Sequence, residues 1–85
     1  MAYRVDLTPV ARRELGGLDS SVRERILRAL IALETNPRPP RVKKLKGDGN
    51  YWRTRLGDYR VIYEIRDDAL VVLVVRIAHR REAYR

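Results

Sequence analysis

Cysteine is absent from this chain, and histidine and tryptophan occur once each. Without cysteine there are no disulfides and no thiol nucleophile, which argues against a small secreted scaffold. One histidine leaves a conventional zinc site with too few ligands. The Asp67-Asp68 pair is more typical of a turn than of a magnesium site, and the glycines match no phosphate-loop pattern. We therefore expect neither a metal nor a cofactor.

Long apolar runs are also missing. The longest is ALVVLVV, residues 69–75, which is far short of the ~20 residues that span a bilayer. The opening residues MAYR already carry a charge and begin no apolar signal segment. We expect a cytoplasmic protein with no membrane partner.

Acidic residues are scarce, because 11 Asp and Glu stand against 19 Lys and Arg, for a net charge of +8. Nine basic and three acidic residues lie between positions 36 and 66, so most of the excess is there. This favours a polyanionic partner, most simply nucleic acid, although composition alone leaves an acidic protein or a membrane surface open. The alternative is an ordinary solvated face, since 16 of the basic residues are arginine and can reflect compositional bias.

The first third of the chain predicts a strand and two helices within one small domain, residues 1–85. Apolar side chains alternate over residues 3–7, as in a strand. Thr8-Pro9 supplies a cap and a first-turn proline for a helix that Gly16-Gly17 should keep short. Apolar residues at 22, 26, 29, 30 and 33 form the core-facing stripe of a second helix, which Asn36-Pro37 ends.

The start of the second helix carries the only two serines. Asp19, Ser20 and Ser21 are expected to cap it, with Ser21 and Glu24 at the spacing of a capping box. If both serines cap this helix, no serine is left to act as the nucleophile of a Ser-His-Asp triad.

Beyond residue 36 the pattern changes from helix to strand. Residues 37–50 are expected to form a loop, and residues 51–56 a strand with Trp52 and Leu56 on an apolar side and Arg53 and Arg55 on a basic side. Because Trp52 shares its side with Leu56, core packing is favoured over stacking on a base.

Two further strands are expected after two-residue turns. Gly57-Asp58 leads to a strand over residues 59–66, and Asp67-Asp68 leads to a strand over residues 69–77. The last strand is apolar on both faces, as in the interior of a sheet. The order β-α-α-β-β-β is an α+β fold, with two N-terminal helices packed on one face of a small, mostly antiparallel sheet.

Arginines gather on the basic side of the expected hairpin. Arg53 and Arg55 lie two residues apart, so their side chains share a face about 6 to 7 Å apart. Arg60 opens the partner strand and can lie near Arg55. Guanidinium groups gathered without carboxylates repel one another, which favours a phosphate between them. The alternative is that each arginine pairs with a surface carboxylate such as Glu64 or Asp58.

The closing segment adds candidate groups for proton transfer. His79, Arg80, Arg81 and Tyr84 follow the last strand and can fold back over the basic side. Histidine ordinarily titrates near neutrality, so His79 is a candidate acid or base, although it can equally cap the strand end. For Tyr84 the choice is between stacking or proton transfer and a disordered tail.

Four segments resemble the RelE branch of the RelE/ParE toxin superfamily: VKKLKG (42–47), RTRL (53–56), GDYRVIYEI (57–65) and AHRREAY (78–84). The resemblance covers essentially the whole chain and implies a toxin of a type II toxin–antitoxin pair. RelE-like toxins bind the ribosome, at its 16S rRNA, and cut mRNA in the A site, and a cognate antitoxin neutralises them by wrapping the toxin surface.

The chemistry that this resemblance implies uses the RNA's own 2′-hydroxyl as the nucleophile. The protein then needs no serine, cysteine or metal, and acts as a metal-independent endoribonuclease. It needs only a proton acceptor, a proton donor and cations that stabilise a phosphorane-like transition state.

The resemblance also implies roles for individual residues. Arg60 matches the phosphate-binding arginine and is expected to be exposed. His79 matches an acid or base, Arg80 or Arg81 a transition-state arginine, and Tyr84 a tyrosine that stacks on or activates the nucleotide. The general base stays open between Glu64 and Glu82. The residues expected to bind RNA phosphates are Lys43, Lys44, Lys46, Arg53 and Arg55.

Two other functions remain open. ParE-like chains share the fold but inhibit DNA gyrase and lack the nuclease residues, and Arg60, His79 and Tyr84 together favour RelE over ParE. A non-catalytic nucleic-acid-binding domain would require only the basic surface.

Overall fold

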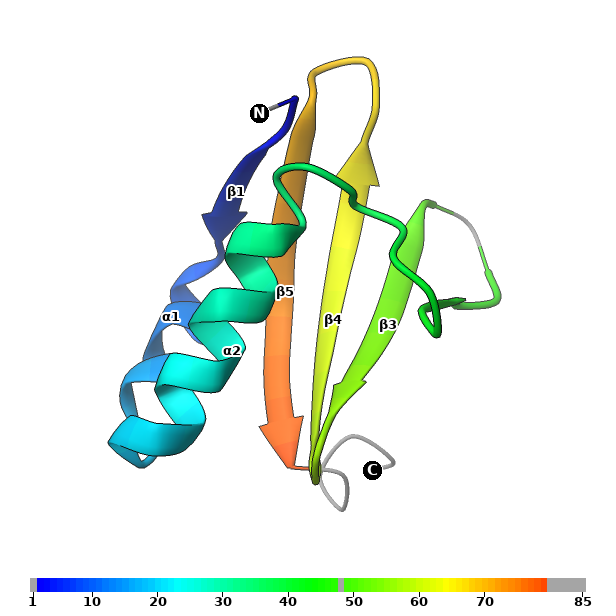
Figure 1. Ribbon diagram of the computed structural model, residues 1–85. Coiled ribbons are helices and arrows are strands. Elements are labelled where there is room, and N and C mark those ends of the chain that lie inside the picture. Colours follow the sequence, from blue (N-terminus) through cyan, green and yellow to red (C-terminus); the bar gives the residue numbers. More distant parts are fainter. Residues whose placement is uncertain (1, 48, 80–85) are drawn as a thin grey trace.

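The period-two pattern of the C-terminal half builds one sheet, and the two amphipathic helices cover one of its faces (Figure 1). The structure is a computed structural model that describes residues 2–47 and 49–79. The sheet order is β1-β5-β4-β3-β2, with β1 parallel to β5 and the other neighbours antiparallel. The elements are β1 (Arg4–Leu7), α1 (Pro9–Gly16), α2 (Ser20–Ala32), β2 (Lys43–Lys44), β3 (Tyr51–Leu56), β4 (Tyr59–Arg66) and β5 (Val71–His79).

The α+β class and the packing of two helices on one face of a mostly antiparallel sheet confirm the prediction. The core lies between these two layers. Its buried residues are Ala11 of α1, Ile26 and Leu30 of α2 with Leu33 just beyond, and a set on the strands: Val61, Tyr63, Ile65, Val72, Val74 and Ile77. No helix among the described residues is long and apolar enough to cross a membrane.

The helix starts agree with the prediction at α1 and only in part at α2. Thr8 caps α1 as predicted, because its side-chain oxygen accepts a hydrogen bond from the Ala11 amide at 3.1 Å. At α2 the cap residue is Asp19, without a side-chain capping bond, and Ser20 and Ser21 already lie in the first turn. The capping box between Ser21 and Glu24 is therefore wrong. Glu24 instead pairs with Arg28, one turn along, at 3.1 Å on the exposed face.

The stretch 37–50, expected to be a loop throughout, contains a fifth strand. In this short β2, Lys43 pairs with Arg53 and Lys44 with Trp52. Without β2, the backbone of β3 would be an unpaired edge of the sheet. The backbone of the two lysines in β2 pairs with this edge. Because β2 buries neither side chain, it has no apolar alternation by which the sequence could reveal it.

The β4–β5 connection is longer than the two-residue turn expected at Asp67-Asp68. Residues 67–70 form the turn, closed by hydrogen bonds from the Ala69 amide to Arg66 O and from the Leu70 amide to Asp67 O, both 3.3 Å. The strand thus begins at Val71 and runs to His79, two residues later at each end than predicted. Ala69 and Leu70 are apolar, so hydropathy could not separate them from the strand. The interior position of β5, between β1 and β4, is confirmed.

A bulge in β5 decides which side chains share a face. Ile62 pairs with Arg76 and Tyr63 with Val74, so Val75 is an extra residue on β5. The bulge shifts the alternation, and Ile77 joins Val72 and Val74 on the helix-covered face.

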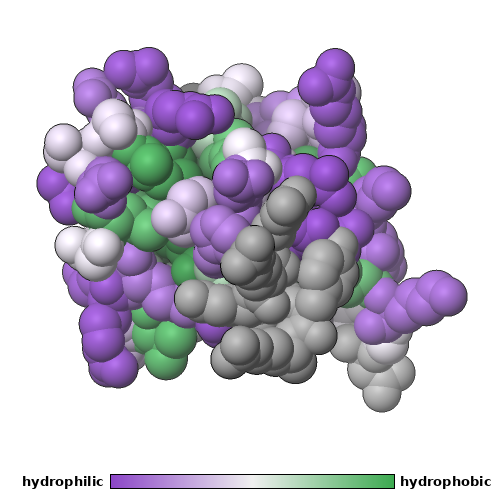
Figure 2. Space-filling view, turned by 90° about the horizontal axis from the view of Figure 1, so that it is seen from below, coloured by the Kyte–Doolittle hydropathy of each residue, from purple (hydrophilic) through white to green (hydrophobic). Residues whose placement is uncertain are grey.

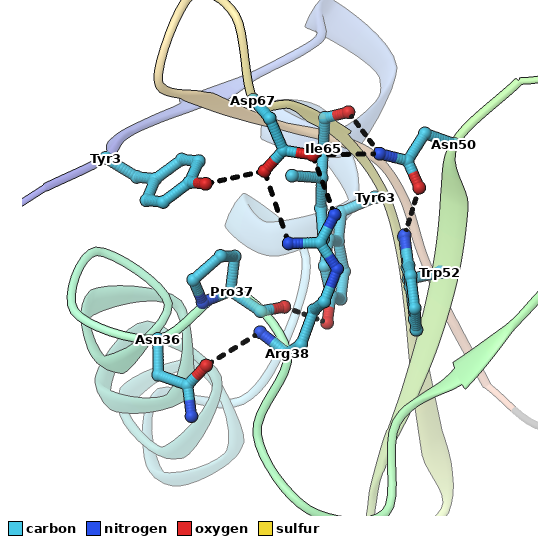
Figure 3. A network of polar contacts seen from close by, with 9 residues as sticks. All are labelled: Tyr3, Asn36, Pro37, Arg38, Asn50, Trp52, Tyr63, Ile65 and Asp67. Carbon is cyan, nitrogen blue, oxygen red and sulfur yellow. Dashed lines mark hydrogen bonds and ion pairs between the residues drawn. The ribbon is translucent and has the colours of Figure 1, made fainter.

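A polar network centred on Asp67 ties the α2–β2 connection to the sheet (Figure 3). Arg38 donates from Nη1 to Asp67 Oδ1 at 3.2 Å and from Nη2 to Oδ2 at 2.8 Å. The Tyr3 hydroxyl donates to Oδ1 at 2.6 Å, and Asn50 Nδ2 lies 3.5 Å from Oδ2. One carboxylate thereby contacts residues from three other parts of the chain.

The aromatic residues of β3 and β4 complete this network. Trp52 packs against the core, as predicted, and its Nε1 donates to Asn50 Oδ1 at 2.6 Å, while the Arg38 guanidinium lies 5.1 Å from its ring centroid. The Tyr63 hydroxyl donates to Pro37 O at 2.9 Å. Burial raises the pKa of Tyr63 to about 12, so this donor stays protonated at neutral pH.

The Asp67 network predicts an acid-dependent loss of stability. Hydrogen bonds from Arg38 and Tyr3 lower the pKa of Asp67 from 3.8 to about 2. A carboxylate whose pKa is lower in the folded state stabilises the fold fully above its ordinary pKa, and this stabilisation is lost as the pH falls towards the folded value. We expect Asp67→Asn to lower the Tm at about pH 6, and the difference from the wild type to shrink between about pH 4 and pH 2.

The matched control is Asp68→Asn, which changes the next residue of the same turn. Thermal unfolding followed by circular dichroism at several pH values compares the three proteins, and Asp68→Asn should follow the wild type throughout. A Tm difference for Asp67→Asn that is the same at pH 6 and pH 2 would contradict the role given to the Asp67 carboxylate.

Candidate functional site

The face of the sheet opposite the helices carries most of the basic side chains of β2, β3 and β4. Trp52 and Leu56 turn toward the core, so Arg53 and Arg55 turn to this open face, as predicted. The register places Arg55 opposite Arg60 and Arg53 opposite Lys43. Side chains of such directly opposed residues are neighbours, with Cβ atoms about 4.5–5.5 Å apart.

A cavity of about 470 Å³ opens among these residues, lined by Arg41, Lys43, Arg53, Arg55 and Gly57. We call it the basic pocket. Among the described residues, all four side chains in its lining are cationic and no carboxylate lines it. Within the part of the chain that the structure describes, none of the four forms an ion pair. The arrangement suits an anion with several oxygens, because phosphate can accept from more than one cation at once.

The carboxylates proposed as alternative partners do not neutralise this pocket. Glu64 accepts a hydrogen bond from Arg66 Nε at 2.8 Å. It lies four residues along β4 from Arg60, which is about 13 Å in a strand. Asp58, in the hairpin turn, lines a second cavity of about 240 Å³ on the helix side, together with Arg25 and Tyr59. Glu64, one of the two residues expected as general base, thus does not line the pocket and is paired with Arg66.

Arg60 differs from the expectation of an exposed cation, because it is only 3% exposed. It lies on β4, the central strand of the five, opposite Arg55 on one side and Ala78 on the other. Its side chain belongs to the same face as that of Arg55, yet it is almost fully buried there. Replacing Arg60 would therefore disturb packing as well as charge, and the exposed arginines are the better probes of the surface.

His79 lies on the helix side of the sheet, away from the basic pocket. It is paired with Tyr59, and the two rings meet edge to face with centroids 5.3 Å apart. It lines a cavity of about 210 Å³ with residues that include Arg13 and Glu14. The β5 bulge causes this placement, since it sets the face of every residue after Val75.

The other predicted residues divide between the pocket, its surroundings and the part of the chain not described. Lys44 is paired with Trp52, so it belongs to the opposite face from Lys43, and Lys46 does not line the pocket. Arg80, Arg81, Glu82 and Tyr84 lie outside the described residues. Arg41 lines the pocket although it was not singled out. The sequence did contain a sign of this position, because Pro39-Pro40 predicts a tight turn directly before Arg41.

Around the residues drawn in grey, the end of the molecule where the β3–β4 hairpin turns shows many hydrophilic residues (Figure 2). In this view the larger apolar patches lie toward the helices. Two exposed apolar residues, Leu27 and Ile31, lie one turn apart on α2, with 40% and 61% of their surface accessible. Across the described residues no three His, Asp or Glu side chains gather as metal ligands.

Comparison with known proteins shows which family the chain resembles in sequence. Residues 5–84 match the family model described as ParE toxin of type II toxin-antitoxin system, parDE. The chain is 31% identical over 85 residues to the mRNA interferase toxin RelE of Escherichia coli, covering 98% of this chain and 88% of that protein. It is 34% identical over 90 residues to Toxin RelG of Mycobacterium tuberculosis, covering 100% and 99% of the two chains.

Solved structures agree in fold. The archaeal RelE-RelB complex from Pyrococcus horikoshii contains a chain with a TM-score of 0.85 and 34% identity, over 94% of this chain and 97% of that one. The intact E. coli RelBE toxin–antitoxin complex gives a TM-score of 0.81 at 30% identity, over 92% and 96%. The family model carries the ParE description while these relatives carry the RelE name. The chain belongs to the RelE/ParE superfamily of type II toxin–antitoxin toxins, as a RelE-like member.

Proposed function

We propose that this RelE-like toxin is an mRNA interferase that binds the ribosome and cleaves mRNA in the A site, thereby inhibiting translation. The observation that carries the proposal is the basic pocket, whose four cations have no carboxylate beside them in the described residues. The similarity to a relative named mRNA interferase toxin RelE supports RNA as the ligand of this surface.

In the proposed reaction the 2′-oxygen of one nucleotide attacks the adjacent phosphorus, and the bond from phosphorus to the 5′-oxygen of the next nucleotide breaks. The products are a cyclic phosphate and a 5′-hydroxyl. Arg53 and Arg55 would stabilise the negative charge that develops on the phosphorane oxygens, since they flank the pocket from one strand face. An attacking group that belongs to the RNA requires no metal-activated water.

Proton transfer is proposed for groups in the closing segment of the sequence. A base must remove the 2′-hydroxyl proton, and an acid must protonate the leaving 5′-oxygen. Tyr84 and Glu82 remain the proposed groups, with Arg80 and Arg81 as further transition-state cations. His79, at the end of β5, would have to act from the helix side of the sheet, which makes it the weaker candidate of the set.

We also propose a cognate antitoxin as the protein partner. Solved relatives are complexes of RelE with RelB from P. horikoshii and E. coli. The exposed Leu27 and Ile31 on α2 offer an apolar strip that such a partner would cover, on the opposite side of the sheet from the basic pocket.

The paired substitution Arg53→Ala/Arg55→Ala tests the site. Both side chains lie on the open face, outside the core, so the fold should survive. Loss of one transition-state donor commonly lowers the rate about 10²–10³-fold, and loss of two should abolish growth arrest. The measurement is growth after induction, with sequencing of mRNA ends that bear a 5′-hydroxyl in a ribosome-containing translation extract.

The matched control, Arg4→Ala/Arg28→Ala, removes the same charge from β1 and α2, where each arginine is exposed and paired with a carboxylate. It should arrest growth and cut mRNA as the wild type does. New mRNA ends that persist undiminished in a folded Arg53→Ala/Arg55→Ala protein would rule out the basic pocket as the site. An SOS response and altered DNA supercoiling with intact mRNA would instead favour the ParE-like function, and RNA binding without cleavage the non-catalytic one.

Salt dependence gives an independent check on phosphate contacts. Each phosphate contact on single-stranded nucleic acid contributes about 0.7 to the slope of log K against log salt concentration. Fluorescence anisotropy with a short single-stranded RNA should therefore give a steep slope for the wild type. The slope should be shallower by roughly 1.4 for Arg53→Ala/Arg55→Ala, whereas a slope near zero for the wild type would contradict a phosphate-binding face.

A further inference from the structure

The wall of the basic pocket opposite β3 comes from a turn with an unusual residue in it. Residues 39–42 form a β-turn, closed by a hydrogen bond from the Val42 amide to Pro39 O at 3.4 Å. Pro40 occupies the second position, where proline is favoured. Arg41 occupies the third, with φ of 77°. A turn with this φ at its third position is of type II, and type II turns normally place glycine or asparagine there.

The left-handed conformation of Arg41 is a strained one. A side chain with a Cβ approaches the neighbouring carbonyl oxygen in this region, and glycine avoids the contact. Three of the five positive-φ residues of the described chain are glycines, Gly47, Gly49 and Gly57. Arginine at position 41 is thus a departure from the usual choice of residue, and such departures cluster at binding sites.

The segment around Arg41 is held on both sides, so the strained conformation can persist. Before Arg41 in the chain, Pro37 O accepts a hydrogen bond from the Tyr63 hydroxyl, and the Arg38 side chain is hydrogen-bonded to Asp67 (Figure 3). After it, Lys43 and Lys44 pair with β3. Contacts on both flanks fix where the turn projects its side chain, which is into the lining of the basic pocket beside Lys43, Arg53 and Arg55.

We propose that Arg41 is a phosphate-binding residue of this site, retained at a strained turn position because its guanidinium binds the RNA backbone. Arg53 and Arg55 reach the pocket from the sheet and Arg41 reaches it from the connection. A pocket of about 470 Å³ with cations on two walls accommodates more than one phosphate of a single strand. Arg41 contacts the phosphate next to the one that Arg53 and Arg55 hold. The identity of the ligand rests on the proposed function, whereas the anion site itself does not.

The test separates binding from stability, because the two should change in opposite directions. Arg41→Gly and Arg41→Asn both suit the left-handed turn position and remove the charge. We expect their Tm to rise by roughly 2–5 °C as strain is relieved, less for glycine because it also loosens the unfolded chain. We expect the Kd for a short single-stranded RNA, with a 2′-O-methyl group at every position to prevent cleavage, to rise about tenfold.

Two further variants define the charge dependence. Arg41→Lys keeps a cation and the strain, so it should retain most of the affinity and the wild-type Tm, and Arg4→Ala removes an equal charge far from the pocket and should bind as the wild type does. The slope of log K against log salt should be shallower by about 0.7 for Arg41→Gly and unchanged for Arg4→Ala.

The outcomes distinguish this inference from the proposed function. An unchanged Kd and salt slope in Arg41→Gly would overturn the binding role, and an unchanged or lower Tm in Arg41→Asn would overturn the strain. If the variants behave as expected but the wild type produces no mRNA cuts on ribosomes, the anion-binding role of Arg41 holds and the proposed nuclease function fails. If the wild type cuts mRNA on ribosomes and Arg41→Gly binds RNA as tightly as the wild type does, the proposed nuclease function holds and the anion-binding role of Arg41 fails.

Discussion

The pairing register of β3 on β4 is the constraint on which both the core and the basic pocket depend. Trp52 and Leu56 lie opposite Tyr63 and Tyr59 on the helix side, which leaves Arg53 and Arg55 for the open side. A slip by one residue would exchange the two faces, exposing the apolar set and burying two guanidinium groups at high cost. The register that buries the core therefore also assembles the cations. Gly57, with φ of 60°, allows the tight turn that sets this register.

The second determinant of the pocket is the anchoring of the α2–β2 connection. Asp67 binds Arg38 and Tyr3, while Tyr63 holds Pro37 from the core. These bonds lie on the helix side, yet the same connection continues into β2, whose Lys43 is on the open side. The polar network thus positions one wall of the pocket without contributing a side chain to it. Ordinary surface ion pairs add little, but several hydrogen bonds on one carboxylate restrict its geometry as a group.

The sequence carries enough information to predict most of the fold and part of the site. The helix stripe at Ile26 and Leu30 and the alternation around Arg53 and Arg55 follow directly from burial of one face, so they were predicted correctly. β2 could not be predicted, because its two lysines bury nothing and leave no apolar alternation. The β5 bulge was equally hidden, since an inserted residue in an entirely apolar run leaves no mark on hydropathy. It is the bulge that puts His79 on the helix side, away from the pocket.

Phosphate binding by the cations of the basic pocket is tested most directly at the level of single side chains. An NMR titration of the ¹⁵N-labelled toxin with a short, cleavage-resistant single-stranded RNA follows the Nε–Hε signal of each arginine. Binding at the basic pocket predicts that the signals of Arg41, Arg53 and Arg55 shift together and saturate together, while those of Arg4 and Arg28 stay in place. Shifts confined to Arg4 and Arg28, with the pocket arginines unmoved at saturation, would contradict phosphate binding on the open face of the sheet.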